Sequence, residues 1–535
     1  MTDNKIHTIT ISKADIPDGG MKSFKQQDDS ILLITRDNNS FRAFDGKCPH
    51  AGADLGEGLR CGNRIVCPWH HGTFDSTDGR LLEPVATSGL TQYELSDDGD
   101  NLTINTAAKI DHSIDNDKLA QTHTMIVGGG AAGFMTAHHL RQIGYGGKIT
   151  IISKDDKAPY NRTLLSKMFL AGKMDEKHLM LGGNDWAQKH NIDLRLNQVV
   201  SEVLPNESSI IIKDVNGNSE TQTADFLVVA TGAEPTIPPI KGAEQSGVYT
   251  LRTMDDAKAI KQATDGRKVV IVGTGFIGME VASALIQAGK AASITVVGRS
   301  KRVMANIVSE TVSNTLISLH EDKGVTFAFG AGVSEINGTE DNVSGVTLSD
   351  GTRLDADVVI LGTGVSPRTE LLAEVNDPDG VQVDKRLQLR DGVYALGDIA
   401  KAEGQMGRLR IEHWRVALQH GLVTAAAILN EDNVVSLEQR VPFFWTMQYG
   451  KSLRYSGHAA TPDKGILFGS PDQMDYIEYY FDDEGENTRA TAASSLGRDK
   501  ELIAFGELLR RGVAPTRAQL NAGFDIIDQA HALSP

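Results

Sequence analysis

The sequence contains two copies of a glycine-rich turn, each placed between a short apolar strand and a helical pattern. In each copy the first glycine makes the tight turn, the second lets the backbone approach a pyrophosphate, and the third lets the helix pack closely on the strand. The helix N-terminus then faces the phosphate charge. The copies consist of Gly128, Gly130 and Gly133, and of Gly273, Gly275 and Gly278. They lie too far apart for one Rossmann unit, so the chain is expected to bind two dinucleotides.

A second constraint lies near the start of the chain, in Cys48-Pro49-His50 and Cys67-Pro68-Trp69-His70. Two thiolates and two imidazoles at this spacing can surround one small inorganic centre. The flanking stretches CPHAGADLGEG and CPWHHGTFDSTDG resemble the two cluster-binding loops of the Rieske family, in which two Cys hold one iron of a [2Fe-2S] cluster and two His the other. We expect Cys48, His50, Cys67 and His70 to be the ligands, and not His71.

The alternative for these four residues is a tetrahedral zinc site, which the same ligand types allow. Zinc sites usually pair like ligands within each half of the motif, whereas each half here combines one Cys with one His. The remaining thiol, Cys61, is expected to be buried, and no disulfide is expected, which fits a reducing compartment.

Length and charge limit the class of protein. A chain of 535 residues is too long for one core, so several domains are expected. The net charge of −17 argues against nucleic acid or an anionic membrane as a main partner. No apolar run reaches the roughly 18 residues of a membrane span. The first residues alternate like a strand and lack a signal-peptide pattern, so a cytoplasmic protein is expected.

Residues 1–106 contain short β-rich runs, such as ILLITRD and NRIVCPWH, separated by Gly, Asp and Asn. Residues 107–121 are polar and are interpreted as a linker. Between the glycine-rich turns lies DFLVVATGAEP, with Thr231 and Gly232, and after the second turn comes GVYALGDIA, with Gly397 and Asp398.

From residue 122 onward the chain resembles the two-dinucleotide-binding flavoprotein reductases. The similarity is closest to ferredoxin-reductase-like and apoptosis-inducing-factor-like members, through APYNRTLLSK, VGTGFIGMEVA and EHWRVALQHG. A Rieske domain ahead of such a reductase resembles the third apoptosis-inducing-factor type and its bacterial relatives. The resemblance implies a multidomain fold in which an all-β Rieske domain precedes two Rossmann-like α/β domains and a C-terminal α+β domain. The implied ranges are 1–106 for the Rieske domain, 122–251 plus 352–435 for FAD, 252–351 for NAD(P), and 436–535 for the C-terminal domain.

The resemblance also implies roles for single residues. Asp398 would accept hydrogen bonds from the ribityl chain of FAD, although it could also be a helix N-cap. Lys167 and Glu280 match an ion pair beside the flavin, where a cation stabilises the anionic reduced ring; the alternative is two solvated surface charges. Arg162 should lie close to FAD. Trp445 is a candidate to pack near the flavin ring, or else an ordinary core aromatic.

Two departures from the family pattern bear on nucleotide binding. Lys154 stands where many relatives have the Glu that holds the adenosine ribose of FAD, so we assign that role to Asp155. After the second glycine-rich turn, SITVVGRSKRV ends in Gly298-Arg299 without an acidic residue. An Arg nearby can accept the 2′-phosphate of NADP, which favours NADPH slightly and assigns Arg299 to the nucleotide. A solvated basic turn is the alternative.

These residues predict an oxidoreductase that passes electrons from NADH or NADPH through FAD to the cluster, and from there to an unknown acceptor. In the family that the first domain resembles, the ligating His rings lie at the domain tip, so the resemblance implies that His50 and His70 form the electron exit. No C-x4-C lies near the first glycine-rich turn, which excludes a dithiol reductase. Two alternatives remain open: the flavin reduces a separate ferredoxin or small quinone directly, or the protein is a redox sensor. The sequence does not indicate the oligomeric state.

Overall fold

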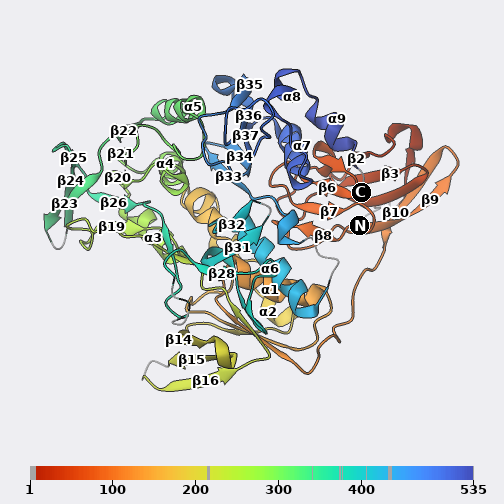
Figure 1. The fold of residues 1–535 in the computed structure, drawn as a ribbon, viewed down its shortest axis with the longest axis horizontal. Coiled ribbons are helices and arrows are strands. Elements are labelled where there is room, and N and C mark those ends of the chain that lie inside the picture. Colours follow the sequence, from red (N-terminus) through yellow and green to blue (C-terminus); the bar gives the residue numbers. More distant parts are fainter. Residues whose placement is uncertain are drawn as a thin grey trace, which may run out of the picture.

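The computed structural model describes residues 8–213, 217–339, 342–372, 375, 377–404, 406–431 and 436–533. The part before residue 110 is built from strands (Figure 1). A six-stranded antiparallel sheet has the order β1-β10-β9-β4-β3-β2, and a four-stranded sheet has the order β5-β6-β7-β8. The strands are β1 (Thr8–Ser12), β2 (Met21–Lys25), β3 (Ile31–Asp37), β4 (Ser40–Asp45), β5 (Leu59–Cys61), β6 (Arg64–Val66), β7 (Thr73–Asp75), β8 (Leu81–Glu83), β9 (Gln92–Asp98) and β10 (Asn101–Lys109).

The two Cys–His loops leave this β-rich part side by side. The first loop connects β4 to β5, and the second connects β6 to β7. Strand β10 continues to Lys109, three residues into the stretch that was interpreted as a linker, because Lys109 pairs with Tyr93 after a bulge.

The first glycine-rich turn belongs to a six-stranded, mostly parallel sheet of order β13-β12-β11-β17-β30-β29. Its strands are short apolar runs, as expected for a sheet that is covered on both faces. Helix α1 (Ala131–Gln142) follows the turn and packs against α6 (Trp414–Leu429). The strands are β11 (His123–Val127), β12 (Lys148–Ile152), β13 (Asp193–Arg195), β17 (Phe226–Val229), β29 (Gln388–Arg390) and β30 (Val393–Ala395).

The second glycine-rich turn belongs to a five-stranded parallel sheet of order β19-β26-β20-β21-β22, followed by helices α4 (Phe276–Ala288) and α5 (Glu310–Glu321). Strands β19 and β26 lie outside the range 252–351 that was expected for this domain, yet both pair within its sheet. The sheet therefore extends beyond both expected boundaries. The strands are β19 (Val248–Thr250), β20 (Lys268–Val272), β21 (Ser293–Gly298), β22 (Val325–Phe329) and β26 (Val358–Leu361).

The C-terminal part is an antiparallel sheet of order β33-β34-β37-β36-β35 with three helices. The expected boundary at 435 lies outside the described residues. The helices α7, α8 and α9 lie beside the N-terminal β-rich part (Figure 1). The elements are β33 (Phe443–Gln448), β34 (Lys451–Gly457), β35 (Ile466–Ser470), β36 (Asp475–Tyr480), β37 (Ala492–Leu496), α7 (Asp499–Arg510), α8 (Arg517–Asn521) and α9 (Ile526–His531).

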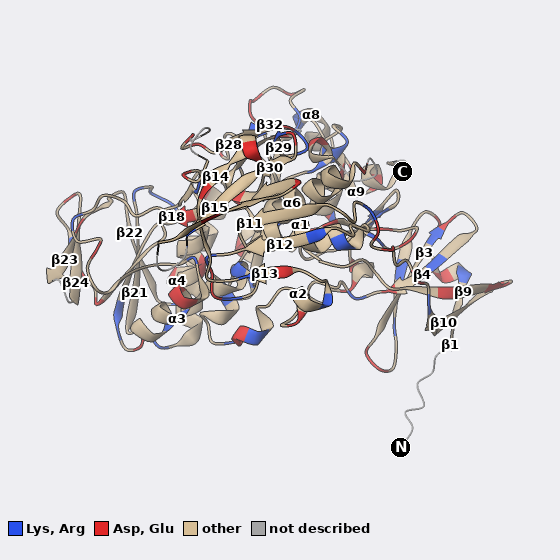
Figure 2. Cartoon of the chain, turned by 90° about the horizontal axis from the view of Figure 1, so that it is seen from below, with Lys and Arg blue, Asp and Glu red and all other residues tan. Residues whose placement is uncertain are grey.

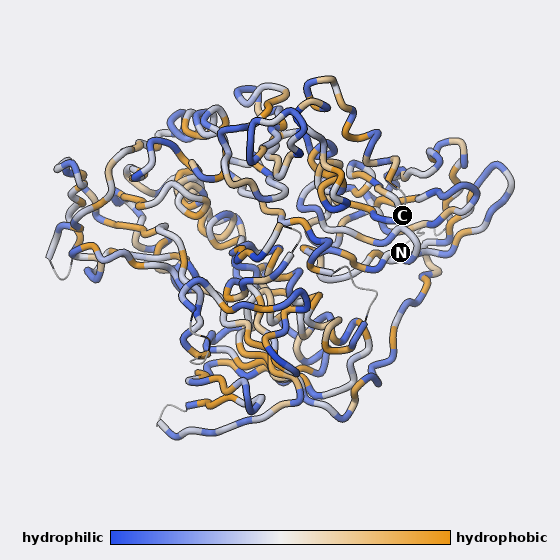
Figure 3. Tube along the Cα trace, viewed as in Figure 1, coloured by the Kyte–Doolittle hydropathy of each residue, from blue (hydrophilic) through white to orange (hydrophobic). Residues whose placement is uncertain are grey.

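Hydrophobic segments concentrate on the inner strands and helices, and both signs of charge are interspersed along the chain (Figures 2 and 3).

One apolar cluster joins the N-terminal and C-terminal parts of the chain, since Leu59, Cys61 and Val66 pack with Phe443 and Phe505. Burial, with the nearby Glu507 carboxylate, raises the pKa of the Cys61 thiol to about 12, so Cys61 is the buried thiol that was expected. Among the described helices, none is long and apolar enough to cross a membrane.

A buried charged network at the same boundary centres on Glu83, at the end of β8. Its carboxylate lies 2.6 Å from the Arg440 guanidinium and accepts a hydrogen bond of 2.8 Å from Gln419. Arg415 lies 3.8 Å away, and the side chains of Glu83, Arg415 and Arg440 are at most 6% exposed. Arg64 extends the network to Glu507, at 3.0 Å. Charges buried this deeply depend on their partners, so the network fixes the N-terminal part against the rest of the chain.

Glu83→Ala is expected to destabilise the protein by about 3–5 kcal/mol, because it leaves buried arginines without their counter-charge. Thermal unfolding of the full chain measures the effect. Asp29→Asn is the matched control, since Asp29 pairs with Lys25 at 2.9 Å on the surface with both side chains at least 70% exposed; it should leave the melting temperature almost unchanged. Equal melting temperatures for the two variants would show that the network carries no stability.

Candidate functional site

The two Cys–His loops have matching backbone hydrogen bonds. The Cys48 N–H donates to Ala53 O and the Cys67 N–H to Gly72 O, while each cysteine carbonyl accepts from Gly52 and His71, respectively. Gly52 and His71 both adopt the left-handed conformation, with φ of 77° and 54°. His71 therefore closes the second loop as Gly52 closes the first, and its ring stacks on Phe443 with ring centroids 4.0 Å apart.

The four predicted ligands lie close together in two pairs, the two cysteines in one pair and the two histidines in the other. The Cys48 and Cys67 thiols share a hydrogen bond, which lowers the pKa of Cys48 and raises that of Cys67, to which burial adds. The Nδ1 atoms of His50 and His70 lie 3.1 Å apart. Burial lowers the pKa of His50 to about 4 and holds that of His70 well below its usual value, so both rings are neutral and able to ligate a metal. Two thiols on one side and two imidazoles on the other fit the two irons of a Rieske cluster.

The histidine side of this centre faces Trp445 of the reductase part. The His70 ring lies 4.5 Å from the Trp445 ring, and the His50 ring 6.5 Å from it, centroid to centroid. The pKa of His70 is lowered mainly by burial, then by His50, and further by the positive charges of Arg454 and Lys167. The predicted ligand His70 is therefore close enough to Lys167, the predicted flavin lysine, to feel its charge. The structure therefore places His50 and His70, both part-exposed, beside Trp445 of the reductase part, and their expected role as the electron exit stays a prediction.

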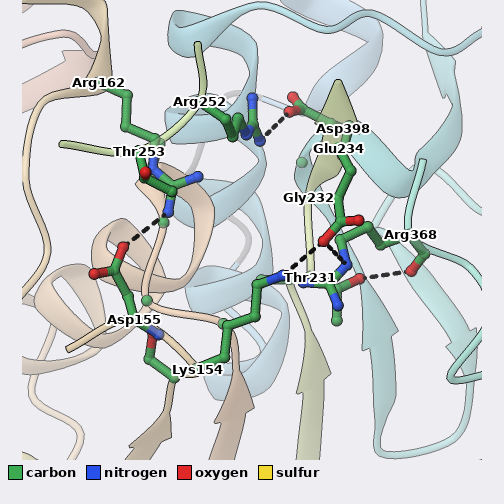
Figure 4. A pocket seen from close by; sticks show the side chains of 18 of the residues that line it. Lys154, Asp155, Arg162, Thr231, Gly232, Glu234, Arg252, Thr253, Arg368 and Asp398 are labelled. Atoms are coloured by element: carbon green, nitrogen blue, oxygen red, sulfur yellow. Dashed lines mark hydrogen bonds and ion pairs between the residues drawn. The ribbon is translucent and has the colours of Figure 1, made fainter. Parts of the chain in front are cut away.

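A cavity of about 810 Å³ lies at the first glycine-rich turn (Figure 4). A Cβ at Gly128 would lie 2.2 Å from Ala230 O and one at Gly133 2.1 Å from Gly128 O, whereas nothing lies within 4 Å of the Cβ position of Gly130. The turn thus leaves room for a ligand only at its middle glycine. The predicted FAD residues that line the cavity are Gly128, Gly130, Asp155, Arg162, Thr231, Gly232, Gly397 and Asp398.

Two arginines on the wall of this cavity call for an anion. The Nε atoms of Arg162 and Arg252 are buried and make no hydrogen bond among the described residues. Burial, followed by the positive charge of Arg252, lowers the pKa of Arg162. Their acidic neighbours are Asp155, 3.6 Å from Arg162, and Asp398, 3.1 Å from Arg252. Two close guanidiniums beside a glycine-rich turn fit the pyrophosphate of FAD.

The last strand of the first sheet delivers Asp398 to the cavity. After β30 the chain forms a short helix, Gly397–Ile399, whose N-cap is Leu396, so Asp398 is not the N-cap. The Gly397 N–H donates to His420 Nδ1 at 3.1 Å, which holds the turn. The carboxylate of Asp398 is 14% exposed.

The end of the cavity at Lys154 and Asp155 carries a chain of alternating charges. Lys154 Nζ lies 2.6 Å from Glu234, and Arg368 lies 3.1 Å from the same carboxylate (Figure 4). Asp155 accepts a hydrogen bond of 3.1 Å from the Tyr160 hydroxyl. Sequence reasoning missed Arg252 and Arg368, which stand in no motif, and Glu234, which lies two residues after Gly232 in the stretch DFLVVATGAEP; all three line the cavity.

Lys167 and Glu280 form a buried ion pair of 2.7 Å, with side chains 7% and 3% exposed. The alternative of two solvated surface charges is therefore wrong. Glu280 is fixed by the hydroxyl of Thr446, at 2.8 Å, and by Ser166. Lys167 also donates to Thr163 O at 2.9 Å. An ammonium has three N–H donors, so within the described part of the chain one donor of Lys167 stays available for a ligand.

The second glycine-rich turn repeats the first. A Cβ at Gly273 would lie 2.2 Å from Gly362 O, one at Gly278 2.0 Å from Gly273 O, and one at Gly275 would meet nothing within 4 Å. Arg299 follows β21 and is exposed. The nearby Arg302 donates two hydrogen bonds to the Asp463 carboxylate, at 2.7 Å and 2.8 Å.

The fold and the site together define a flavoprotein with two dinucleotide sites and an attached iron–sulfur centre. Comparison with known families agrees: residues 122–421 match the pyridine nucleotide-disulphide oxidoreductase family, and residues 7–94 match the Rieske [2Fe-2S] domain. The chain belongs to the pyridine nucleotide-disulphide oxidoreductase family and carries a Rieske domain ahead of it. Its cofactors are a [2Fe-2S] cluster, FAD and NAD(P)H, and it is an oxidoreductase.

Similar proteins include apoptosis-inducing factor 3 from Mus musculus, 29% identical over 94% of this chain and 83% of the relative. Rhodocoxin reductase from Rhodococcus erythropolis is 30% identical over 75% of this chain and 93% of the relative. Among solved structures, a ferredoxin reductase from Rhodopseudomonas palustris superposes with a TM-score of 0.70 at 28% identity, covering 77% of this chain and all of that one. The covalent putidaredoxin reductase–putidaredoxin complex gives the same values.

Lys167→Ala is expected to slow reduction of the bound flavin by NAD(P)H by about 10²-fold, as loss of one preorganised electrostatic contact does in other enzymes. Stopped-flow absorbance of the flavin measures the rate. Lys173→Ala is the control, since Lys173 lies in the same segment but binds Gln287 at the surface. A Lys167→Ala rate equal to that of the control would reject the role.

Proposed function

We propose that electrons pass from the flavin site to the cluster through the contact between Trp445 and His70, so that the Rieske centre lies on the main path. When bound, FAD takes a hydride from NAD(P)H and gives single electrons to the [2Fe-2S] cluster. Lys167 and Glu280 are proposed to act at the flavin edge, and Asp398, Arg162 and Arg252 to hold FAD. The observation that carries the proposal is the 4.5 Å separation of the Trp445 and His70 rings.

Strand β33 supports this route because it joins both sites. Successive side chains of a strand point to opposite faces. Trp445 packs against His70, and the next residue, Thr446, donates to Glu280 of the proposed flavin pair. The flavin pair and a cluster ligand are thus contacted by adjacent residues of one strand. Trp445, expected near the flavin ring, is proposed to bridge the two centres.

The docked position of the Rieske domain weakens the alternative in which the flavin reduces a separate ferredoxin. Trp445 faces the cluster histidines of the same chain, and the Glu83 network holds that arrangement. A separate carrier would have to share this edge with the chain's own Rieske domain. The acceptor is therefore proposed to take its electrons from the cluster.

Trp445→Leu is expected to slow cluster reduction by at least about tenfold while flavin reduction by NAD(P)H keeps its rate. Losing the ring opens a gap between the two sites, and displacements of about 1 Å can cost far more than this at a reacting centre. Stopped-flow absorbance follows the flavin, and rapid-freeze EPR follows the cluster. Phe468→Leu, an exposed aromatic on β35, is the control. Unchanged cluster reduction in Trp445→Leu would remove Trp445 from the path.

For the nucleotide, we propose that Arg299 receives the 2′-phosphate of NADPH. The support is its place directly after β21, its exposure, and the absence of an acidic side chain at this strand end, where NAD sites usually carry one. The proposed compartment is the cytoplasm, where the three cysteines, all free in the structure, would stay reduced.

Arg299→Ala is expected to lower kcat/KM for NADPH by about 10–100-fold, the value of a hydrogen bond to a charged group, and to leave kcat/KM for NADH nearly unchanged. Steady-state turnover with an artificial acceptor measures both constants. Lys323→Ala removes an exposed cation from the same domain and serves as the control. A strong preference for NADH in the unaltered protein would defeat the proposal.

A further inference from the structure

The second cluster loop is held from outside by two arginines of the reductase part. Arg454, on β34, donates from Nε to Trp69 O at 2.7 Å. Arg415, near the start of α6, donates from Nη2 to His71 O at 3.0 Å. The two carbonyls belong to the residues on either side of the ligand His70. Each guanidinium is thus hydrogen-bonded to the backbone next to the predicted cluster ligand His70, although neither arginine belongs to the Rieske domain.

Both arginines are themselves fixed. Arg454 pairs across the hairpin with Trp445, and its Nη1 binds Asp499 at 2.7 Å while its Nε faces the loop. Arg415 donates from Nε to Pro84 O at 2.8 Å, and its guanidinium carbon lies 5.4 Å from the centre of the Phe443 ring. Their side chains are 10% and 6% exposed. These contacts fix the orientation of both guanidiniums, so that Arg454 Nε and Arg415 Nη2 point toward the second cluster loop.

We propose that Arg454 and Arg415 are positioning residues through which the reductase part sets the geometry of the second cluster loop and raises the reduction potential of the cluster. The proposal rests on the proposed function, in which this cluster receives the electrons. A reduced cluster carries one more negative charge than the oxidised one, so nearby buried cations stabilise the reduced form. Net charge, hydrogen bonding and solvent exposure are the levers that set such potentials.

The proposal also explains the backbone of the loop. His71 holds a left-handed conformation that is uncommon for a residue other than glycine, and such conformations persist only where the surroundings hold them. The Arg415 bond to its carbonyl and the stacking of its ring on Phe443 come from the reductase part. The first loop, with Gly52 at the matching position, needs no such support.

The test is a mediated redox titration of the full-length holoprotein, with the cluster followed by EPR and the flavin by absorbance. Arg454→Gln is expected to shift the cluster equilibrium about tenfold toward the oxidised form, which is about 59 mV for one electron, and to change the EPR g values. Arg454→Lys keeps the positive charge but not the guanidinium geometry, so it should shift the equilibrium less than Arg454→Gln and still change the EPR g values. Arg415→Gln should shift it in the same direction.

Arg517→Gln is the matched control, because Arg517 also donates to backbone carbonyls, Lys464 O at 3.0 Å and Asp483 O at 3.2 Å, in the C-terminal part. Potentials for the Arg454 and Arg415 variants equal to that of Arg517→Gln would overturn the proposal. Where Arg454→Gln loses its iron, Arg454→Lys decides in the same way. The titration uses a chemical reductant, so a cluster that NAD(P)H fails to reduce counts against the proposed function and not against the arginines.

Discussion

The structure depends on one internal contact, the docking of the second cluster loop against strands β33 and β34. On the reductase side of this contact, Trp445 meets the His70 ring and Arg454 meets the Trp69 carbonyl. Behind it, Glu83 and its arginines form a network that is almost closed to water. A charge buried with its partners is costly to separate from them, so the contact behaves as part of the core and not as a transient encounter between domains.

This contact brings the proposed flavin site and the iron–sulfur centre together in one chain. Nicotinamide delivers two electrons together and a [2Fe-2S] cluster accepts one, so a flavin between them is the required adapter. The flavin site and the cluster must lie close together for electrons to pass between them. They lie in one chain, and strand β33 contacts both: Trp445 packs against His70, and Thr446 bonds to Glu280 of the Lys167–Glu280 pair. The same docking places the histidine edge of the cluster, which stays part-exposed, against Trp445 of the reductase part.

Local patterns in the sequence predicted the parts that they encode. The glycine-rich turns predicted both dinucleotide folds, because only glycine fits where Gly128 approaches Ala230 and Gly273 approaches Gly362. The Cys–His spacing predicted four side chains that do meet. The sequence could not show that His50 and His70 lie beside Trp445, because that contact depends on residues hundreds of positions away. Arg252 and Glu234 were missed for the same reason, and β19 and β26 were misassigned because strand pairing is a property of the folded sheet.

In the proposed route, reducing equivalents from the nucleotide reach the Rieske cluster inside one polypeptide. Anaerobic titration of the purified full-length protein with NADPH and with NADH, followed by absorbance for the flavin and by EPR for the cluster, tests it directly. We expect the flavin to bleach and the signal of a reduced Rieske cluster to rise at the same additions of nucleotide. If the flavin bleaches while the cluster stays oxidised, although dithionite reduces it, the cluster does not receive electrons from the flavin of its own chain.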